Sequence, residues 1–213
     1  MSRYDSEQEQ IDAIKAWWAK NGTMLLSGIL IVAIAFAGWR YWQSYQQTQA
    51  ANASALYEVL EMTNSNGTFG EVAREARKLL QDQPASPYAG GAALMLAQFH
   101  WEKAETDDAI DMLQWILDSK QSVQIKQVAA LRLARVQTEL KEYAAAQNTL
   151  NELAAQSIEP TQQANVDYAL AMLALAQQEN ATALEAFKRV IDNQAGSADL
   201  RNLAQLQMDD LAQ

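Results

Sequence analysis

The feature that most constrains the fold is an uncharged, apolar run near the N-terminus. It extends from Asn21 to Trp39, between Lys20 and Arg40. As an α-helix these 19 residues reach about 28 Å, close to the ~30 Å hydrocarbon core of a bilayer. Aromatic residues flank both ends, as in the interfacial belts of membrane proteins: Trp17, Trp18, Trp39, Tyr41, Trp42 and Tyr45. We therefore predict a transmembrane helix over residues 21–42, preceded by a tail of residues 1–20.

Basic residues near this run predict its orientation. Arg3, Lys15 and Lys20 precede it, whereas Arg40 alone follows closely and the next basic residue is Arg74. The cytoplasmic flanks of spanning helices are enriched in lysine and arginine. The tail is therefore expected in the cytoplasm, and the rest of the chain on the opposite side of the membrane.

A cleaved signal peptide is the alternative to an anchor. The Ala-Phe-Ala sequence at residues 35–37 resembles a small-x-small cleavage site. However, the segment before the apolar run carries Asp5, Glu7, Glu9 and Asp12, whereas signal peptides usually begin with a short basic region. The anchor is the favoured interpretation, and cleavage would instead release the remaining chain from the membrane.

The sequence after the anchor repeats itself. We predict a linker helix and a degenerate repeat over residues 43–84, with a break at residues 64–67, and repeats over residues 85–213 that match at a shift of 37 residues. The matching positions carry alanine or a larger apolar residue: Ala97, Ala134 and Ala171; Ala109, Ala146 and Ala183; Leu113, Leu150 and Phe187; Ile116, Leu153 and Val190. Such a period is typical of a solenoid and accommodates two helices. We predict an all-α solenoid of helical hairpins, closed by a capping helix in residues 197–213.

Composition and motifs argue against catalysis and against a nucleic-acid partner. The net charge is −10 and no basic stripe is present, whereas phosphate binding relies on lysine and arginine. Cysteine is absent, and the single histidine, His100, is expected to pack or lie at the surface rather than to bind a metal. Asp107, Asp108 and Asp111 could form a weak cation site, but the first two are better explained as acidic residues at a helix N-terminus. We predict no catalytic residue, metal site, cofactor or small-molecule substrate.

The repeats resemble, in part, the tetratricopeptide repeat. The alanine and large apolar positions match, while the usual period of about 34 residues and the tryptophan, glycine, tyrosine and proline positions are mostly missing. The resemblance implies that the first helix of each unit lines a concave groove. The groove positions are Leu94, Gln98, Trp101, Leu131, Arg135, Thr138, Tyr168, Met172 and Leu175. An apolar partner segment is expected there, unless residues 43–62 or the C-terminal helix fill the groove.

Three further segments together resemble the YfgM family of ancillary SecYEG translocon subunits. They are residues 4–22, with Trp17-Trp18 ahead of Asn21-Gly22; residues 38–42, Gly-Trp-Arg-Tyr-Trp; and residues 131–136, Leu-Arg-Leu-Ala-Arg-Val. The resemblance implies a single-pass protein of the bacterial inner membrane with a cytoplasmic N-terminus and a periplasmic C-terminal domain. It also implies association with the SecYEG translocon and with a PpiD-like periplasmic chaperone, and help in transferring exported proteins.

Three functional classes follow from these features. The first is a non-enzymatic scaffold or co-chaperone at the export channel, and the second is a tetratricopeptide scaffold for another envelope complex, such as cell-wall synthesis or outer-membrane assembly. The third is an enzyme, which would require a cluster of buried polar groups that the repeats do not display. Only the family resemblance separates the first class from the second.

Overall fold

The computed structural model describes residues 3–66, 69–156 and 158–211. Every element in these ranges is an α-helix, which confirms the predicted all-α fold. The chain divides into two compact units, Met1–Ala51 and Asn52–Gln213.

The first unit consists of the N-terminal part of a long helix, α1 (Arg3–Asn66). Within the described residues, one stretch of helix is long and apolar enough to cross a membrane, Gln10–Tyr45. It includes the predicted span over residues 21–42 and the aromatic residues at both of its ends. Its large apolar side chains, such as Ile31 and Phe36, are exposed, so their apolar surface is available to lipid.

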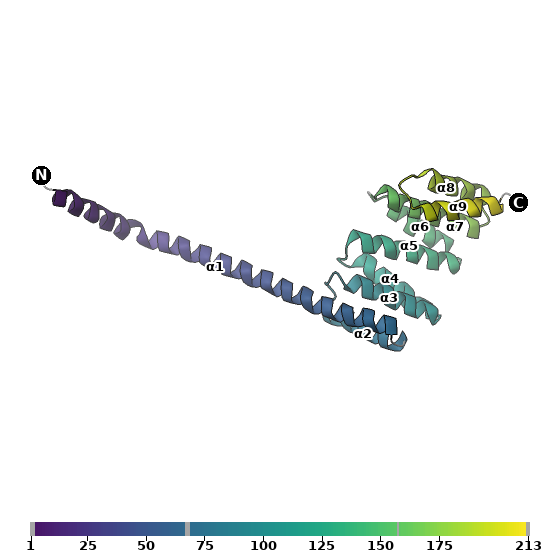
Figure 1. Cartoon of the computed structure of the whole chain (residues 1–213), viewed down its shortest axis with the longest axis horizontal. Coiled ribbons are helices and arrows are strands. Elements are labelled where there is room, and N and C mark those ends of the chain that lie inside the picture. Colours follow the sequence, from purple (N-terminus) through teal and green to yellow (C-terminus); the bar gives the residue numbers. More distant parts are fainter. Residues whose placement is uncertain (1–2, 67–68, 157, 212–213) are drawn as a thin grey trace. The chain divides into compact units, whose positions relative to one another are not determined.

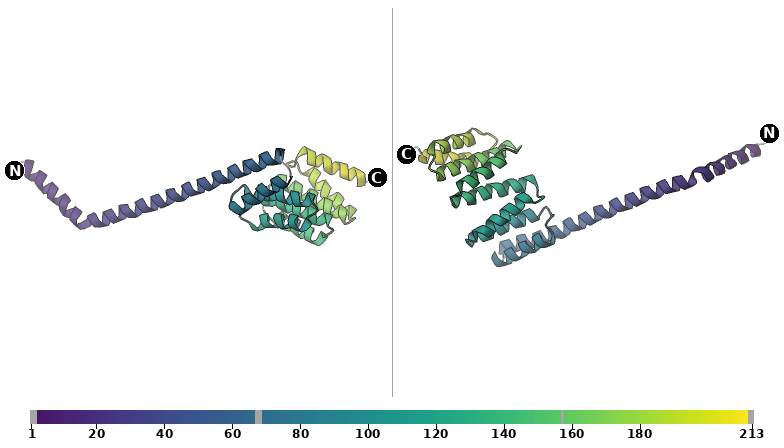
Figure 2. Two further views of the ribbon diagram at one scale, coloured as in Figure 1. Left: turned by 90° about the horizontal axis from the view of Figure 1, so that it is seen from below. Right: turned by 180° about the vertical axis from the view of Figure 1, so that it is seen from behind.

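The second unit stacks antiparallel helix pairs one upon another, as Figures 1 and 2 show. It begins with the last turns of α1, and residue 67 of the predicted break lies outside the described residues. The helices that follow are α2 (Phe69–Asp82), α3 (Ala89–Glu102), α4 (Thr106–Asp118), α5 (Val123–Glu139), α6 (Tyr143–Ala154), α7 (Pro160–Ala176), α8 (Asn180–Asp192) and α9 (Ala198–Leu211). The hairpins are α3–α4, α5–α6 and α7–α8, and α9 packs on the last of them.

The positions that recur every 37 residues form the core of this solenoid. The six recurring alanines are at most 4% exposed, and the six larger apolar residues are at most 3% exposed. The small alanine side chains allow the two helices of a hairpin to approach closely, while the larger residues fill the space between them. In α2, Ala76 and Leu79 are fully buried at the corresponding positions, as expected of a degenerate repeat.

The three hairpin turns share one backbone geometry. Each contains a residue with a positive φ angle: Ala104 (58°), Lys141 (65°) and Gln178 (64°). The next residue is a glutamate, whose amide donates a hydrogen bond to a carbonyl at the end of the preceding helix. The pairs are Glu105 to His100 at 2.9 Å, Glu142 to Gln137 at 2.8 Å and Glu179 to Ala174 at 2.9 Å. Backbone hydrogen bonds of this kind satisfy the last carbonyls of a helix.

Candidate functional site

A cleft of about 320 Å³ lies between α3 and α5, the first helices of two successive hairpins. We call it the α3–α5 cleft. Its lining consists of Ala97, Gln98, Trp101, Glu102, Leu113, Arg132, Arg135, Val136 and Glu139. The lining residues are 97, 98, 101 and 102 on α3 and 132, 135, 136 and 139 on α5, and this periodicity places each set on one helical face. The cleft is therefore formed by the stacking of one hairpin on the next.

The polar side chains of the cleft are mostly fixed within their own helix. Gln98 donates a hydrogen bond through Nε2 to Oε1 of Glu102 at 2.9 Å, and Arg135 donates through Nε to Oε1 of Glu139 at 2.9 Å. Arg132 instead reaches from α5 to α3, where Nη1 donates to the carbonyl of Leu94 at 3.4 Å. Among the described residues its guanidinium has no carboxylate partner, so its remaining donors are available to a ligand.

The apolar part of the cleft is anchored in the core. Trp101 packs against the cluster that contains the buried residues Ala97, Leu113 and Val136. An indole and two guanidinium groups over an apolar floor are typical of surfaces that bind protein side chains. Both glutamates of the cleft already accept a hydrogen bond, Glu102 from Gln98 and Glu139 from Arg135.

A second cleft, of about 380 Å³, adjoins the first. We call it the Tyr57 cleft, and it is lined by Tyr57, Val72, Gly91, Leu94, Met95, Gln98, Ile125 and Arg132. The shared lining residues Gln98 and Arg132 make the two clefts neighbours. Tyr57 stacks on Tyr88 with ring centroids 5.4 Å apart and covers Gly91, where an added Cβ would lie 3.1 Å from the tyrosine ring.

Two segments were candidates to fill the groove, residues 43–62 and the C-terminal helix, and the structure shows where each lies. From the predicted linker helix, Tyr57 lines the Tyr57 cleft. The C-terminal helix α9 packs on α7 and α8. Among the described residues, the lining of the α3–α5 cleft includes none from α1 or α9.

The structure brings together four of the nine predicted groove residues and places the other five elsewhere. Leu94, Gln98, Trp101 and Arg135 line the two clefts. Met172 is 40% exposed on α7. The other four are partly buried. Leu131 packs against two core clusters, and Tyr168 and Leu175 pack against the cluster around Phe187. The Thr138 hydroxyl donates to the Ala134 carbonyl of its own helix at 2.7 Å.

Sequence reasoning missed several residues that line the clefts. On α5 the lining face contains Arg132, Val136 and Glu139, one position beyond the predicted Leu131 and Thr138. The face is shifted because Leu131 points into the contacts with α6 and α7. The residue types could have signalled this, since leucine is more often buried than arginine.

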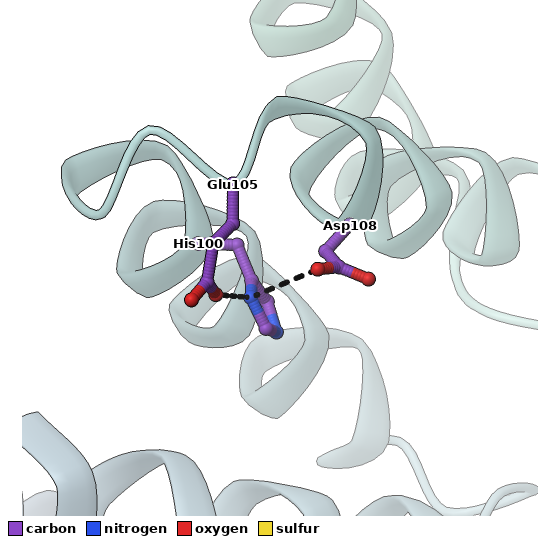
Figure 3. A group of neighbouring side chains, drawn as sticks. All are labelled: His100, Glu105 and Asp108. Atoms are coloured by element: carbon purple, nitrogen blue, oxygen red, sulfur yellow. Dashed lines mark hydrogen bonds and ion pairs between the residues drawn. The ribbon is translucent and has the colours of Figure 1, made fainter.

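Outside the clefts, three potential metal ligands lie close together at the first hairpin turn. His100, Glu105 and Asp108 each offer a ligand atom, and these atoms lie within 4.8 Å of one another (Figure 3). Asp107 and Asp108 lie in the first turn of α4, as predicted, where their charge complements the helix dipole. The sequence predicts that His100 packs or lies at the surface, and the structure buries it beside this turn.

Comparison with known proteins identifies the family. A model of the tetratricopeptide repeat-like domain matches residues 15–213. The chain is 35% identical over 151 residues to the ancillary SecYEG translocon subunit of Escherichia coli K12, covering 71% of this chain and 72% of that protein. It is 31% identical over 153 residues to the protein of the same name from Haemophilus influenzae Rd, covering 71% and 74%.

Solved structures show the same fold at much lower sequence identity. MamA (41-end) from Desulfovibrio magneticus RS-1 superposes with a TM-score of 0.54 at 15% identity, covering 75% of this chain and 87% of that one. This likeness concerns the fold alone. The family model and these two relatives show that the chain belongs to the tetratricopeptide repeat-like family and to the family of ancillary SecYEG translocon subunits.

Proposed function

We propose that this protein is a non-enzymatic ancillary subunit of the SecYEG translocon, which binds a periplasmic chaperone and helps to transfer exported proteins. The observation that carries the proposal is the match to relatives of that name over about 70% of the chain. The repeat architecture adds support, because stacked hairpins provide binding surfaces. The chaperone partner rests on the family resemblance described for the sequence.

The proposed location is the bacterial inner membrane, with the N-terminus in the cytoplasm and the repeats in the periplasm. The basic residues before the span and the apolar stretch Gln10–Tyr45 support this orientation. Because the chain contains no cysteine, single-cysteine variants can test it. In spheroplasts, a membrane-impermeant maleimide should label Asn202→Cys, on α9, and leave Ser6→Cys unlabelled until the membrane is opened. The reverse labelling pattern would invert the topology.

The proposed binding surface for a protein partner is the α3–α5 cleft. Tryptophan and arginine are enriched at the energetic centres of protein interfaces, and Trp101 lines this cleft together with two arginines. Arg132 has donors to spare for carbonyl or carboxylate groups of the partner. The predicted residues that pack within the fold, such as Leu131 and Tyr168, would support the surface rather than contact the partner.

Crosslinking in native membranes, followed by affinity purification of the full chain, tests the proposed partners. Recovery of SecY together with a periplasmic chaperone is the expected result. Recovery of cell-wall or outer-membrane assembly proteins without SecY would favour the alternative, a scaffold for another envelope complex. A variant with the apolar stretch replaced by an unrelated spanning helix serves as control, because it separates binding by the repeats from binding by the anchor.

A further inference from the structure

We propose that His100, Glu105 and Asp108 form a binding site for a divalent first-row transition metal ion of the Zn²⁺ type. Nδ1 of His100 lies 2.6 Å from Oε2 of Glu105 and 3.9 Å from Oδ2 of Asp108. In Figure 3 the imidazole, from the end of α3, and both carboxylates, from the turn and the start of α4, point toward one another. One imidazole nitrogen and two carboxylate oxygens are therefore available to a single ion.

The other two hairpins act as an internal control for this inference. All three turns share the positive φ angle, the following glutamate and the same amide-to-carbonyl hydrogen bond. At the register of His100, the second and third hairpins have Gln137 and Ala174, and at the register of Asp108 they have Ala145 and Thr182. The turn therefore forms without a histidine or an aspartate at these positions. The backbone geometry of the turn therefore does not explain why both occur in the first hairpin.

Burial holds the His100 imidazole in one orientation. His100 is 9% exposed, and its Nδ1 faces the two carboxylates. The carboxylate side chains are more accessible, at 43% for Glu105 and 63% for Asp108, so they can adjust their positions and water can complete the coordination. Ligands about 2.0–2.2 Å from a zinc ion lie roughly 3.0–3.6 Å apart in tetrahedral geometry. Glu105 needs to move slightly outward and Asp108 slightly inward to reach that spacing.

The donor set indicates the class of ion. Calcium and magnesium prefer oxygen ligands alone, whereas imidazole suits zinc, copper, nickel and iron. Binding requires His100 to present the lone pair of Nδ1, so any proton on Nδ1 leaves for solvent. The hydrogen bond from this nitrogen to Glu105 is then replaced by bonds from both residues to the ion.

Calorimetric titration of the full chain in detergent micelles with Zn²⁺ tests this site. One saturable equivalent is expected, with Ca²⁺ binding at least about tenfold more weakly. His100→Gln and Asp108→Ala introduce the residue types that the second hairpin already carries at these positions, so each should fold and lower the Zn²⁺ affinity at least about tenfold. Glu142→Gln, in the second turn, is the matched control and should leave the affinity unchanged.

Several results would overturn the site: no saturable Zn²⁺ binding by the unmodified chain, equal affinities in the His100→Gln variant and the unmodified chain, or Ca²⁺ binding as tight as Zn²⁺ binding. The thermal unfolding of each metal-free variant is measured alongside. If His100→Gln unfolds early, Asp108→Ala decides the question, because the Asp108 side chain lies 3.9 Å from the imidazole and contributes little to the turn.

Discussion

Two junctions of this solenoid follow the same 37-residue register and present different surfaces. Where α5 stacks on α3, the register places Trp101, Arg132 and Arg135 around a cleft. Where α7 stacks on α5, the same positions carry Thr138, Ala169 and Met172. There, α7 contacts α5 more extensively than α5 contacts α3. The comparison shows that the side chains at a junction decide whether two stacked hairpins close up or leave a cleft.

Side-chain size explains the difference in physical terms. At the second junction, Leu173 packs in one buried cluster with Ala134 and Leu150, and Leu170 adds to it from α7. At the first junction, the indole of Trp101 and the long side chains of the arginines line a space instead of filling it. The hairpins themselves remain alike, because their buried alanines and their turns are the same in all units.

The largest expected effect concerns core packing at the second junction. Leu173 is 1% exposed, so Leu173→Ala should lower the free energy of unfolding by about 2–5 kcal/mol. Its counterpart at the first junction, Val136, is 8% exposed and faces the cleft, so Val136→Ala should lower it by only about 1–1.5 kcal/mol. Urea unfolding of the full chain in detergent measures both. Equal losses would mean that the two junctions are packed equally well.

The next prediction concerns binding at the first junction. Trp101→Thr introduces the residue type that the second hairpin carries at this register, and it should weaken partner binding by about 2 kcal/mol or more, roughly 30-fold. Met172→Ala, on the exposed face of α7, should change binding little. The yield of crosslinked partner from native membranes gives the comparison.

Because Trp101 also packs on the core, a matched variant keeps this test decisive. Arg132→Ala removes an exposed guanidinium from the same cleft and introduces the residue type found at Ala169. It should weaken binding and lower the urea midpoint only slightly, because the fold loses just the 3.4 Å hydrogen bond to the Leu94 carbonyl. If Met172→Ala weakens partner capture more than Arg132→Ala and Trp101→Thr, the binding surface lies at the second junction instead.

A smaller effect is expected where α3 and α5 approach closely at the other end of the first junction. A Cβ on Gly90 would lie 2.6 Å from Cγ2 of Ile125 and 2.9 Å from Oε1 of Gln121. Gly90→Ala should therefore lower the free energy of unfolding by about 1–3 kcal/mol through overpacking. Gly70→Ala is the control, because a Cβ there meets no atom within 4 Å. If the urea midpoint falls equally in both variants, lack of space around Gly90 does not explain the loss of stability.

The sequence predicted the parts of this fold that depend on local periodicity. The alanine and leucine spacing located the hairpins, because each buried position needs a small or apolar residue whatever its neighbours are. The apolar run near the N-terminus was equally readable, because bilayer thickness fixes the length of a spanning helix.

Features that depend on two elements at once could not be predicted in this way. Whether a groove position is open depends on the distance between two stacked helices, so residue spacing could not show that Leu131 and Tyr168 pack partly against core clusters. The cluster of His100, Glu105 and Asp108 forms across a turn, where the spacing along one helix gives no signal. Comparing the repeats for the positions at which they differ would have singled out His100 and Arg132.

The smallest expected effect tests whether the turns of the first and third hairpins carry the same backbone strain. Ala104 and Gln178 have φ angles of 58° and 64°, in the region that glycine adopts without the clash of a Cβ atom. Ala104→Gly and Gln178→Gly should each raise the free energy of unfolding by about 0.5–1 kcal/mol, since relief of backbone strain outweighs the added freedom of the unfolded chain. Gly substitution at the helical Ala144 of α6 is the control and should lower it by a similar amount. Ala104 belongs to the hairpin at the first junction, and Gln178 belongs to the hairpin on which α9 packs. Equal gains in the free energy of unfolding would mean that the hairpins are alike and that only the junctions differ. Unequal gains would mean that the hairpins differ as well.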